Sequence, residues 1–201
     1  TWHIPEASKT AIIYFGGNAE DVALNIAPFT KKFPGLSLYL PNYRGYGGST
    51  GCPTEKGLYA DALTLFDSIS GQYSHMTIIG RSLGTGVAAY LAGQRDIRSL
   101  ILITPYDSMV DTAAHHYPFF PVSLLLKDRY DSIRHTQNIT AKTLILVAEH
   151  DTIIPGERSS RLAEAFQTGQ AHLELIENTD HNTISLAPRY QSILTGFISS
   201  K

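Results

Sequence analysis

The part of the sequence with the clearest chemical potential is residues 80–84, Gly-Arg-Ser-Leu-Gly, which match the pattern Gly-x-Ser-x-Gly. A short apolar run, Thr77–Ile79, precedes this pattern, and a run of small residues typical of a closely packed helix follows it. In that context the pattern indicates a sharp strand-to-helix turn that exposes the serine hydroxyl, with glycines relieving the crowding on either side. We therefore predict that Ser82 is a nucleophile. The alternative is a structural turn without chemistry.

A serine hydroxyl is a weak nucleophile at neutral pH and needs a base that a third group orients. For a serine in this kind of turn, the acid and then the base follow it along the chain. His181 lies between the last apolar run and a helix-like segment, whereas His172 begins that run and suits a structural or surface role. The sequence therefore predicts His181 as the general base.

The orienting acid is expected directly after a strand that lies between the serine and the histidine. Asp151 comes just after the apolar run 143–148 and is the predicted acid, with Glu149 as the nearest rival. Asp107 and Asp111 follow an earlier run and are weaker alternatives. The chemistry available to such a trio is acyl transfer through the serine.

Acyl transfer builds negative charge on a carbonyl oxygen, which preorganised N–H groups must stabilise. Leu83 follows the nucleophile and offers the first backbone N–H. The second is expected from the loop after the apolar run 11–15, where Asn18 is the preferred donor and Gly17 and Ala19 are alternatives. The non-catalytic interpretation of this loop is a plain turn in which Asn18 caps the next helix, and both roles are compatible.

Short apolar runs that end in turn residues alternate with amphipathic segments along the chain. The runs are 11–15, 36–40, 77–79, 100–103, 143–148 and 173–176, and the helix-like segments are 21–33, 58–69, 83–91, 157–166 and 184–198. Such runs are typical of parallel strands buried on both faces, and their alternation with helices predicts an α/β fold with a mostly parallel, helix-flanked sheet. The loops that carry the candidate residues are expected at the carboxyl edge of that sheet, where ligands bind.

Residues 106–138 interrupt the alternation with helix-like and aromatic pieces and no clear strand. We predict a single α/β domain over residues 1–201 in which this segment is a small helical, lid-like insertion over the carboxyl edge; an ordinary helical connection is the alternative. Several apolar residues of the segment are candidates for an acyl pocket or, alternatively, for the core. They are Phe119, Phe120, Val122 and Leu124–Leu126.

The composition is that of an ordinary globular protein, with 43% hydrophobic and 17% charged residues. The net charge of −2 gives no reason to expect nucleic acid or anionic lipid as a partner. Cys52 is the single cysteine, so no internal disulfide forms, and it lies in a Gly/Pro loop without a nearby histidine, which argues against a catalytic thiol. No apolar run approaches the roughly 18 residues that a membrane span needs, and the compartment is not readable from the sequence.

Five segments of the chain, in order, resemble one known group of proteins. They are 14–20 (Tyr-Phe-Gly-Gly-Asn-Ala-Glu), 42–49 (Asn-Tyr-Arg-Gly-Tyr-Gly-Gly-Ser), 80–86, 150–155 and 180–182. The chain resembles the α/β-hydrolase-domain serine hydrolases of the Bem46 and depalmitoylating branch, near the prolyl-oligopeptidase clan. The match to residues 42–49 is its most specific part.

The resemblance implies the α/β-hydrolase fold, a triad of Ser82, Asp151 and His181, and oxyanion donors at Leu83 and in the Asn18 loop. It also implies small-molecule or lipid-like ester or thioester substrates and no cofactor or metal. Many members carry an N-terminal membrane anchor, so membrane association through a segment outside this chain is a further expectation.

Two departures from the branch stand out, and one shared loop has an expected role. Members usually have His-Gly-Asn where residues 16–18 read Gly-Gly-Asn, and Lys142 stands where proline is common. The missing histidine is usually a structural brace, so its loss bears on the rigidity of the oxyanion loop. The loop around Arg44 is expected to brace the site.

Other functions remain as alternatives to a serine hydrolase that cleaves esters or thioesters. One is a non-catalytic binding module on the same fold, since a fold alone does not establish activity. Another is a peptidase or amidase. A third is a metal hydrolase that uses Asp111, His115 and His116, of which the first two are spaced to share a helix face.

Overall fold

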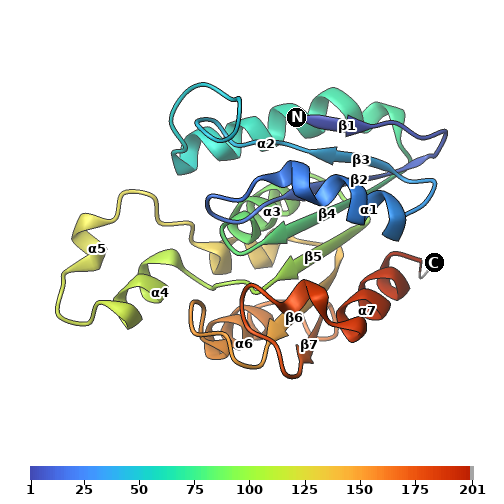
Figure 1. Ribbon diagram of the computed structural model, residues 1–201. Helices are drawn as coiled ribbons and strands as arrows, with labels where there is room; N and C mark the ends of the chain where they lie inside the picture. The colour runs from blue at the N-terminus through green and yellow to red at the C-terminus, as the bar shows by residue number, and fades with distance from the viewer. Residues whose placement is uncertain (200–201) are drawn as a thin grey trace.

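The computed structural model describes residues 1–199, which form a seven-stranded sheet with helices on both faces (Figure 1). The strand order across the sheet is β1-β3-β2-β4-β5-β6-β7. The strands are β1 (Trp2–Ile4), β2 (Thr10–Phe15), β3 (Ser37–Leu40), β4 (His75–Arg81), β5 (Ser99–Ile103), β6 (Lys142–Ala148) and β7 (Ala171–Ile176). All neighbouring strands are parallel except β1, which pairs antiparallel with β3. The predicted α/β sheet is confirmed.

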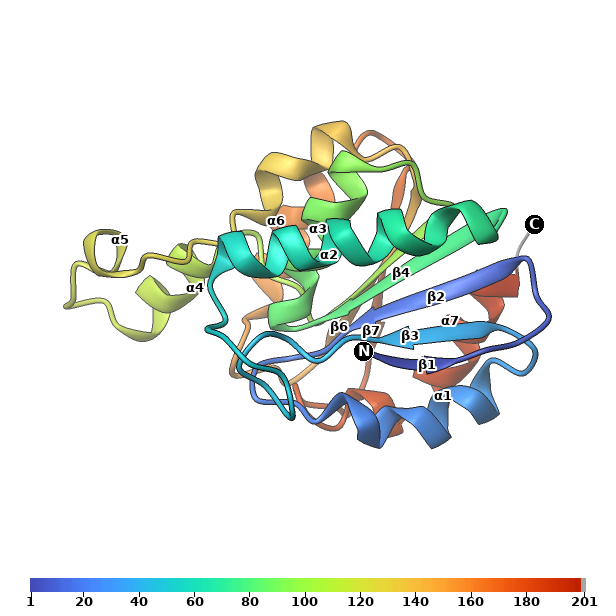
Figure 2. The ribbon, with the colours of Figure 1, turned by 90° about the horizontal axis from the view of Figure 1, so that it is seen from above.

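Two helices cover one face of the sheet and three cover the other (Figure 2). The first pair is α1 (Ile26–Lys32) and α7 (Pro188–Ser199), and the second group is α2 (Glu55–Ile69), α3 (Leu83–Gln94) and α6 (Gly156–Glu164). Short 3₁₀ segments are η1 (Val22–Asn25), η2 (Ser70–Gln72), η3 (Ser132–Asn138) and η4 (Ile184–Leu186). Each of the five predicted helix-like segments overlaps one of these helices.

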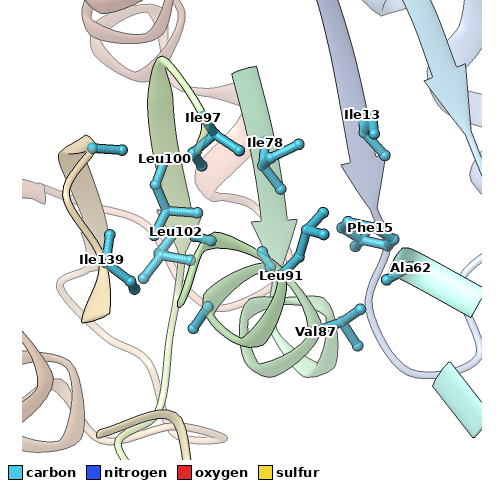
Figure 3. Packing of buried hydrophobic residues seen from close by; sticks show 14 of the residues in the cluster. Ile13, Phe15, Ala62, Ile78, Val87, Leu91, Ile97, Leu100, Leu102 and Ile139 are labelled. Atoms are coloured by element: carbon cyan, nitrogen blue, oxygen red, sulfur yellow. The ribbon is translucent and has the colours of Figure 1, made fainter. Parts of the chain in front are cut away.

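Alternation along the strands divides the core into two layers, because successive side chains point to opposite faces. Ile13 and Phe15 of β2 belong to the same core layer as α2 and α3, and Figure 3 shows Phe15 beside Ala62 of α2. Ile12 and Tyr14 face α1 and α7 instead. Each large apolar side chain buried in this way contributes about 1.5–3 kcal/mol. The two layers hold the strands, and with them the loops at the carboxyl edge, in fixed positions.

The start of the first helical segment differs from one expectation. Asn18 does not cap it, because the side chain of Asp21 accepts the hydrogen bond from Ala23 N at 3.0 Å at the start of η1. At α2 the hydroxyl of Thr54 accepts from Gly57 N at 3.2 Å, so that helix begins three residues before the predicted apolar pattern.

The segment between β5 and β6 contains α4 (Met109–His116), α5 (Val122–Leu125) and η3, and no strand, as the sequence indicates. Figure 2 shows α4 and α5 extending outward from the carboxyl edge of the sheet. Leu124 and Leu125 are 84% and 65% exposed, so the interpretation of these residues as core is wrong. Glu55, at the start of α2, holds the returning chain by accepting from Arg129 N and Tyr130 N at 2.8 and 3.1 Å.

Within residues 1–199, no helix has the length and apolar character that crossing a bilayer requires.

Candidate active site

Ser82 sits at a strained turn between β4 and α3. Its backbone angles, φ +50° and ψ −118°, lie in a region that residues with a side chain rarely adopt. The turn is held because Ser82 N donates to Ile103 O at 2.9 Å, while Ser82 O accepts from both the amide and the hydroxyl of Thr85, at 2.9 and 2.6 Å. These bonds stabilise a conformation that presents the serine side chain at the carboxyl edge of the sheet.

The two glycines of the pattern are required by close backbone approach. A Cβ on Gly84 would lie 2.1 Å from Phe15 O, and a Cβ on Gly80 would lie 2.5 Å from Gly84 O. Both distances are far inside van der Waals contact with backbone atoms that cannot move independently. Glycine at these positions therefore lets α3 start directly against β2 and β4.

His181 links the serine to a carboxylate. Its Nε2 lies 2.9 Å from Ser82 Oγ, and its Nδ1 lies 2.7 Å from Asp151 Oδ2. The side chains of His181 and Asp151 are 8% and 1% exposed. The other carboxylate oxygen of Asp151 accepts from the amides of Ile153 and Ile154 at 2.9 and 2.8 Å, which orients the group independently of the histidine. The structure thus brings the three predicted residues together.

The loops that carry these residues follow β4, β6 and β7, so all three emerge at the carboxyl edge. The rival acids are engaged elsewhere. Glu149 Oε2 accepts from Asn178 N at 2.7 Å, and the buried Asp107 lies 3.3 Å from the guanidinium of Arg158. The other histidine considered, His172, is exposed and contacts Glu174 at 2.8 Å.

Three successive residues of the loop after β2 are each held by a hydrogen bond. Tyr43 donates its hydroxyl to Gly16 O at 2.8 Å, and Tyr46 donates to the side-chain oxygen of Asn18 at 2.5 Å. Between them, Gly17 N donates to Glu20 Oε2 at 2.5 Å. Because that amide already has an acceptor, the alternative in which Gly17 N–H stabilises an oxyanion is wrong, and Gly17 contributes to the pocket wall instead.

The backbone N–H groups of Asn18, of Ala19 and of Leu83, the first residue of α3, have no hydrogen-bond acceptor among residues 1–199. Leu83 adjoins Ser82 at the N-terminus of α3, where the helix dipole favours negative charge. Asn18 lines the same pocket as Ser82, whereas Ala19 does not, which leaves the amides of Asn18 and Leu83. These two amides remain the candidates for oxyanion donors.

The expected brace comes from the loop around Arg44, but not from Arg44 itself. Its guanidinium pairs with Asp61 at the surface, at 2.6 and 2.8 Å. Tyr43 and Tyr46 of the same loop make the contacts to the glycine-rich loop described above. Burial raises the pKa of Tyr43 well above its usual value, so its hydroxyl stays protonated and remains a donor. These two tyrosines therefore brace the glycine-rich loop, which lacks the histidine that is usual in the branch.

Glu20 is the site residue that sequence reasoning missed. Its carboxylate accepts from Gly17 N, from the Tyr14 hydroxyl at 2.7 Å and from Asn25 Nδ2 at 2.7 Å. Burial, followed by the neighbouring carboxylate, raises the pKa of Tyr14 well above its usual value, which keeps this phenol a donor. Glu20 falls within segment 14–20, which resembles the branch, and this resemblance is the sequence feature that could have identified it as a site residue.

A pocket of about 360 Å³ surrounds the serine. It is lined by Gly17, Asn18, Glu20, Arg81, Ser82, Ile153, His181 and Asn182. A second, more apolar pocket of about 420 Å³ lies on the α4–α5 segment and is lined by Ala113, Tyr117, Phe120, Val122, Leu125 and Leu126. The two pockets share no lining residue, but α4 contacts the loop that lines the serine pocket, because the ring nitrogen Nε2 of His116 lies 2.8 Å from the carbonyl oxygen of Ile153.

The side chains considered for a metal site do not gather. His116 contacts the carbonyl of Ile153, and Asp111 lies 3.8 Å from the guanidinium of Arg158. Within the described part of the chain, no group of three or more potential metal-ligating side chains is present. The arrangement around Ser82 is instead suited to nucleophilic attack assisted by a general base.

Comparisons with known proteins agree with this architecture. No protein-family model matches the chain. Uncharacterized protein Rv2307c of Mycobacterium tuberculosis is 34% identical over 189 residues, which cover 90% of this chain and 67% of that protein. Human alpha/beta hydrolase domain-containing protein 17B is 27% identical over 204 residues, which cover 96% of this chain and 68% of that protein. The chain therefore spans about two thirds of the length of these relatives.

Solved structures with similar folds have lower sequence identity. MGS-M2, an alpha/beta hydrolase from a deep-sea metagenome library, superposes with a TM-score of 0.78 at 15% identity, over 100% of this chain and 94% of its own. The esterase Pf2001 of Pyrococcus furiosus superposes with a TM-score of 0.75 at 20% identity, over 96% of this chain and 83% of its own. At such identities the similarity shows a shared fold and nothing about function.

Proposed function

The chain belongs to the α/β-hydrolase family, and from that premise we propose that it is a serine hydrolase that cleaves carboxylic esters or thioesters. The observation that carries the proposal is the continuous chain of contacts from Ser82 Oγ to His181 Nε2 at 2.9 Å and from His181 Nδ1 to Asp151 Oδ2 at 2.7 Å. A nucleophile, a base and an orienting acid within hydrogen-bonding reach are what acyl transfer through serine requires.

In the first half of the reaction, His181 Nε2 takes the proton of Ser82 as Oγ attacks the substrate carbonyl carbon. The amides of Leu83 and Asn18 stabilise the resulting oxyanion. When the tetrahedral intermediate collapses, the bond to the leaving group breaks, and the departing alcohol or thiol takes the proton from His181. Asp151 stabilises the imidazolium between these two proton transfers.

In the second half, water attacks the acyl-enzyme while it gives a proton to His181. The bond between the acyl group and Ser82 Oγ then breaks, the serine regains its proton from the imidazolium, and a carboxylic acid leaves. No oxidant, reductant or further co-reactant is needed for this sequence.

The proposed substrates are small-molecule or lipid-like acyl esters. The pocket around Ser82 is compact at about 360 Å³, so a longer acyl chain needs additional apolar surface. The apolar pocket on α4–α5 offers that surface, and His116 of α4 contacts Ile153, which lines the serine pocket. A chain that leaves the serine pocket past Ile153 is therefore proposed to lie against this segment.

The proposal is tested with p-nitrophenyl esters of increasing chain length, on the wild type and on Ser82→Ala, together with labelling by a fluorophosphonate probe. We expect turnover and covalent labelling by the wild type, and loss of both in the variant. Absence of labelling in folded wild-type protein would favour a non-catalytic binding module. Turnover of amide substrates at rates similar to those of esters would favour a peptidase or amidase.

A further inference from the structure

The carboxylate of Glu20 is the meeting point of two loops that flank the nucleophile. One oxygen accepts from Tyr14 and Asn25, and the other accepts from Gly17 N and lies 3.6 Å from a guanidinium nitrogen of Arg81. The side chain is only 13% exposed. A buried carboxylate is costly unless its oxygens are satisfied, and these contacts satisfy both.

The bond between Glu20 and Gly17 N closes a small turn. Glu20 N also donates back to Gly17 O at 3.4 Å, so residues 17–20 are joined in both directions. Ala19, inside this turn, has φ +56°, a conformation that needs such support. Because the carboxylate occupies the Gly17 amide, the Asn18 amide is the donor of this loop that stays free beside the serine pocket, and the turn that contains it is fixed.

Arg81 extends the same network to the base. It is the residue before the nucleophile, and while one of its guanidinium nitrogens faces Glu20, another donates to the carbonyl oxygen of His181 at 3.3 Å. The loop after β2 and the loop after β7 are therefore joined through one acid and one arginine beside Ser82.

We propose that Glu20 is a positioning residue for acyl transfer. Through Gly17 it sets the direction of the Asn18 oxyanion donor, and through Arg81 it holds the backbone of His181. This inference rests on the proposed serine hydrolase function. Glu20 contacts no reacting atom in this scheme, so its influence is exerted through groups that stabilise the transition state. Such groups act on kcat more than on KM.

The test compares Glu20→Ala and Glu20→Gln with a control, Asp67→Asn. Asp67 is a suitable control because it also pairs with an arginine, contacting Arg95 at 2.7 and 2.8 Å, but at the surface away from the serine pocket. Active sites are counted by fluorophosphonate labelling of Ser82, so that kcat is expressed per competent site. The inhibition constant of an aryl boronic acid, whose serine adduct places an oxygen in the oxyanion site, is measured alongside.

For Glu20→Ala we expect kcat per labelled site to fall by about 10- to 100-fold with KM within about threefold, since removal of one oxyanion donor costs roughly 10²–10³. Boronic acid binding is expected to weaken by a similar factor. Glu20→Gln should retain more activity than Glu20→Ala, because one amide oxygen can still accept from Gly17 N. Asp67→Asn should match the wild type.

An unchanged kcat per labelled site in Glu20→Ala, or an unchanged boronic acid constant beside a reduced kcat, would overturn the inference. If Glu20→Ala does not fold, Glu20→Gln carries the test, because glutamine keeps an acceptor for Gly17 N but loses the charge that faces Arg81. A smaller but measurable fall of kcat and of boronic acid binding is then expected, and values within twofold of wild type contradict the proposal. Failure of the wild type to label at Ser82 would instead remove the proposed function, and this inference with it.

Discussion

Asp151 contacts His181 with one carboxylate oxygen and the backbone of its own loop with the other. The first contact is 2.7 Å long, and the second oxygen accepts the amides of Ile153 and Ile154. The backbone of its own loop thus orients the Asp151 carboxylate, and this orientation does not depend on the contact with His181. A substitution that alters the oxygen facing His181 but keeps the one bound to the loop should therefore change activity and leave stability nearly unchanged.

The first prediction concerns Asp151→Asn. A carboxamide keeps one oxygen for the backbone amides but stabilises neither the correct imidazole tautomer nor the imidazolium, so kcat is expected to fall by about 10⁴-fold, the effect of this substitution in an established serine triad. Steady-state kinetics with a p-nitrophenyl ester and thermal denaturation check this, and the midpoint of unfolding should change little. Glu149→Gln is the matched control, and an equal loss there would point to the rival acid.

The second prediction concerns the strained turn. Ser82→Gly relieves a conformation that costs about 1–3 kcal/mol, whereas Ser82→Ala retains it. Glycine also gives the unfolded chain more conformational entropy, which lowers the stability of the folded protein by about 0.5–1 kcal/mol. The free energy of unfolding of Ser82→Gly is therefore expected to exceed that of Ser82→Ala by about 1 kcal/mol. Urea denaturation of both inactive variants measures it. A glycine variant less stable than the alanine variant would mean that the serine conformation is not strained.

The third prediction is a pH dependence of stability. Burial beside Tyr59 and Tyr90 lowers the pKa of His135 from its ordinary value of 6.5. As pH falls below that value, the unfolded chain takes up a proton at this residue before the folded chain does. The unfolded state then holds more protons, so the free energy of unfolding decreases as pH falls through this window.

Urea denaturation between about pH 7 and pH 5 tests this linkage. The His135→Gln variant has no proton to bind at this position, so its stability should fall less over the same range than that of the wild type. Parallel curves for the two proteins would contradict the prediction.

The fourth prediction concerns the acyl chain. Leu125→Asn removes apolar surface from the pocket on α4–α5 and is expected to lower kcat/KM for an octanoyl ester by about 5- to 10-fold, or roughly 1 kcal/mol of apolar contact. An acetyl ester is too short to reach the pocket and should be unaffected. Leu186→Asn, which alters a residue that is 73% exposed and lines neither pocket, serves as control. Equal losses for both esters would place the acyl chain elsewhere.

The sequence predicted six strands and the segments that carry five helices, because buried parallel strands give continuous apolar runs that end in turn residues. It did not predict β1 (Trp2–Ile4), a short edge strand with exposed residues that has no such run. Such a strand is defined by its pairing with β3, which is a property of the assembled sheet.

The three residues that meet at the candidate site were predictable from motif and chain order, because the order of strands and loops fixes which side chains share an edge. The supporting contacts were not. Tyr43 reaches Gly16 across 27 positions, and Arg81 reaches His181 across 100. Glu20 acts through backbone groups of its own turn, and no spacing rule for reactive residues identifies that role.

The alignment of β5, β6 and β7 has a consequence for how folding and activity are related. Leu146 lies opposite Ile103, and Ala148 lies opposite Ile176. A slip of β6 by two residues would return every apolar side chain to its own face, yet carry Asp151 roughly 6–7 Å along the strand direction and out of reach of His181. A protein misaligned in this way would keep the in-and-out alternation of its side chains but lose the contact between Asp151 and His181. Under the proposed function, the rate of ester cleavage therefore depends on the strand register itself, which the alternation pattern alone does not fix.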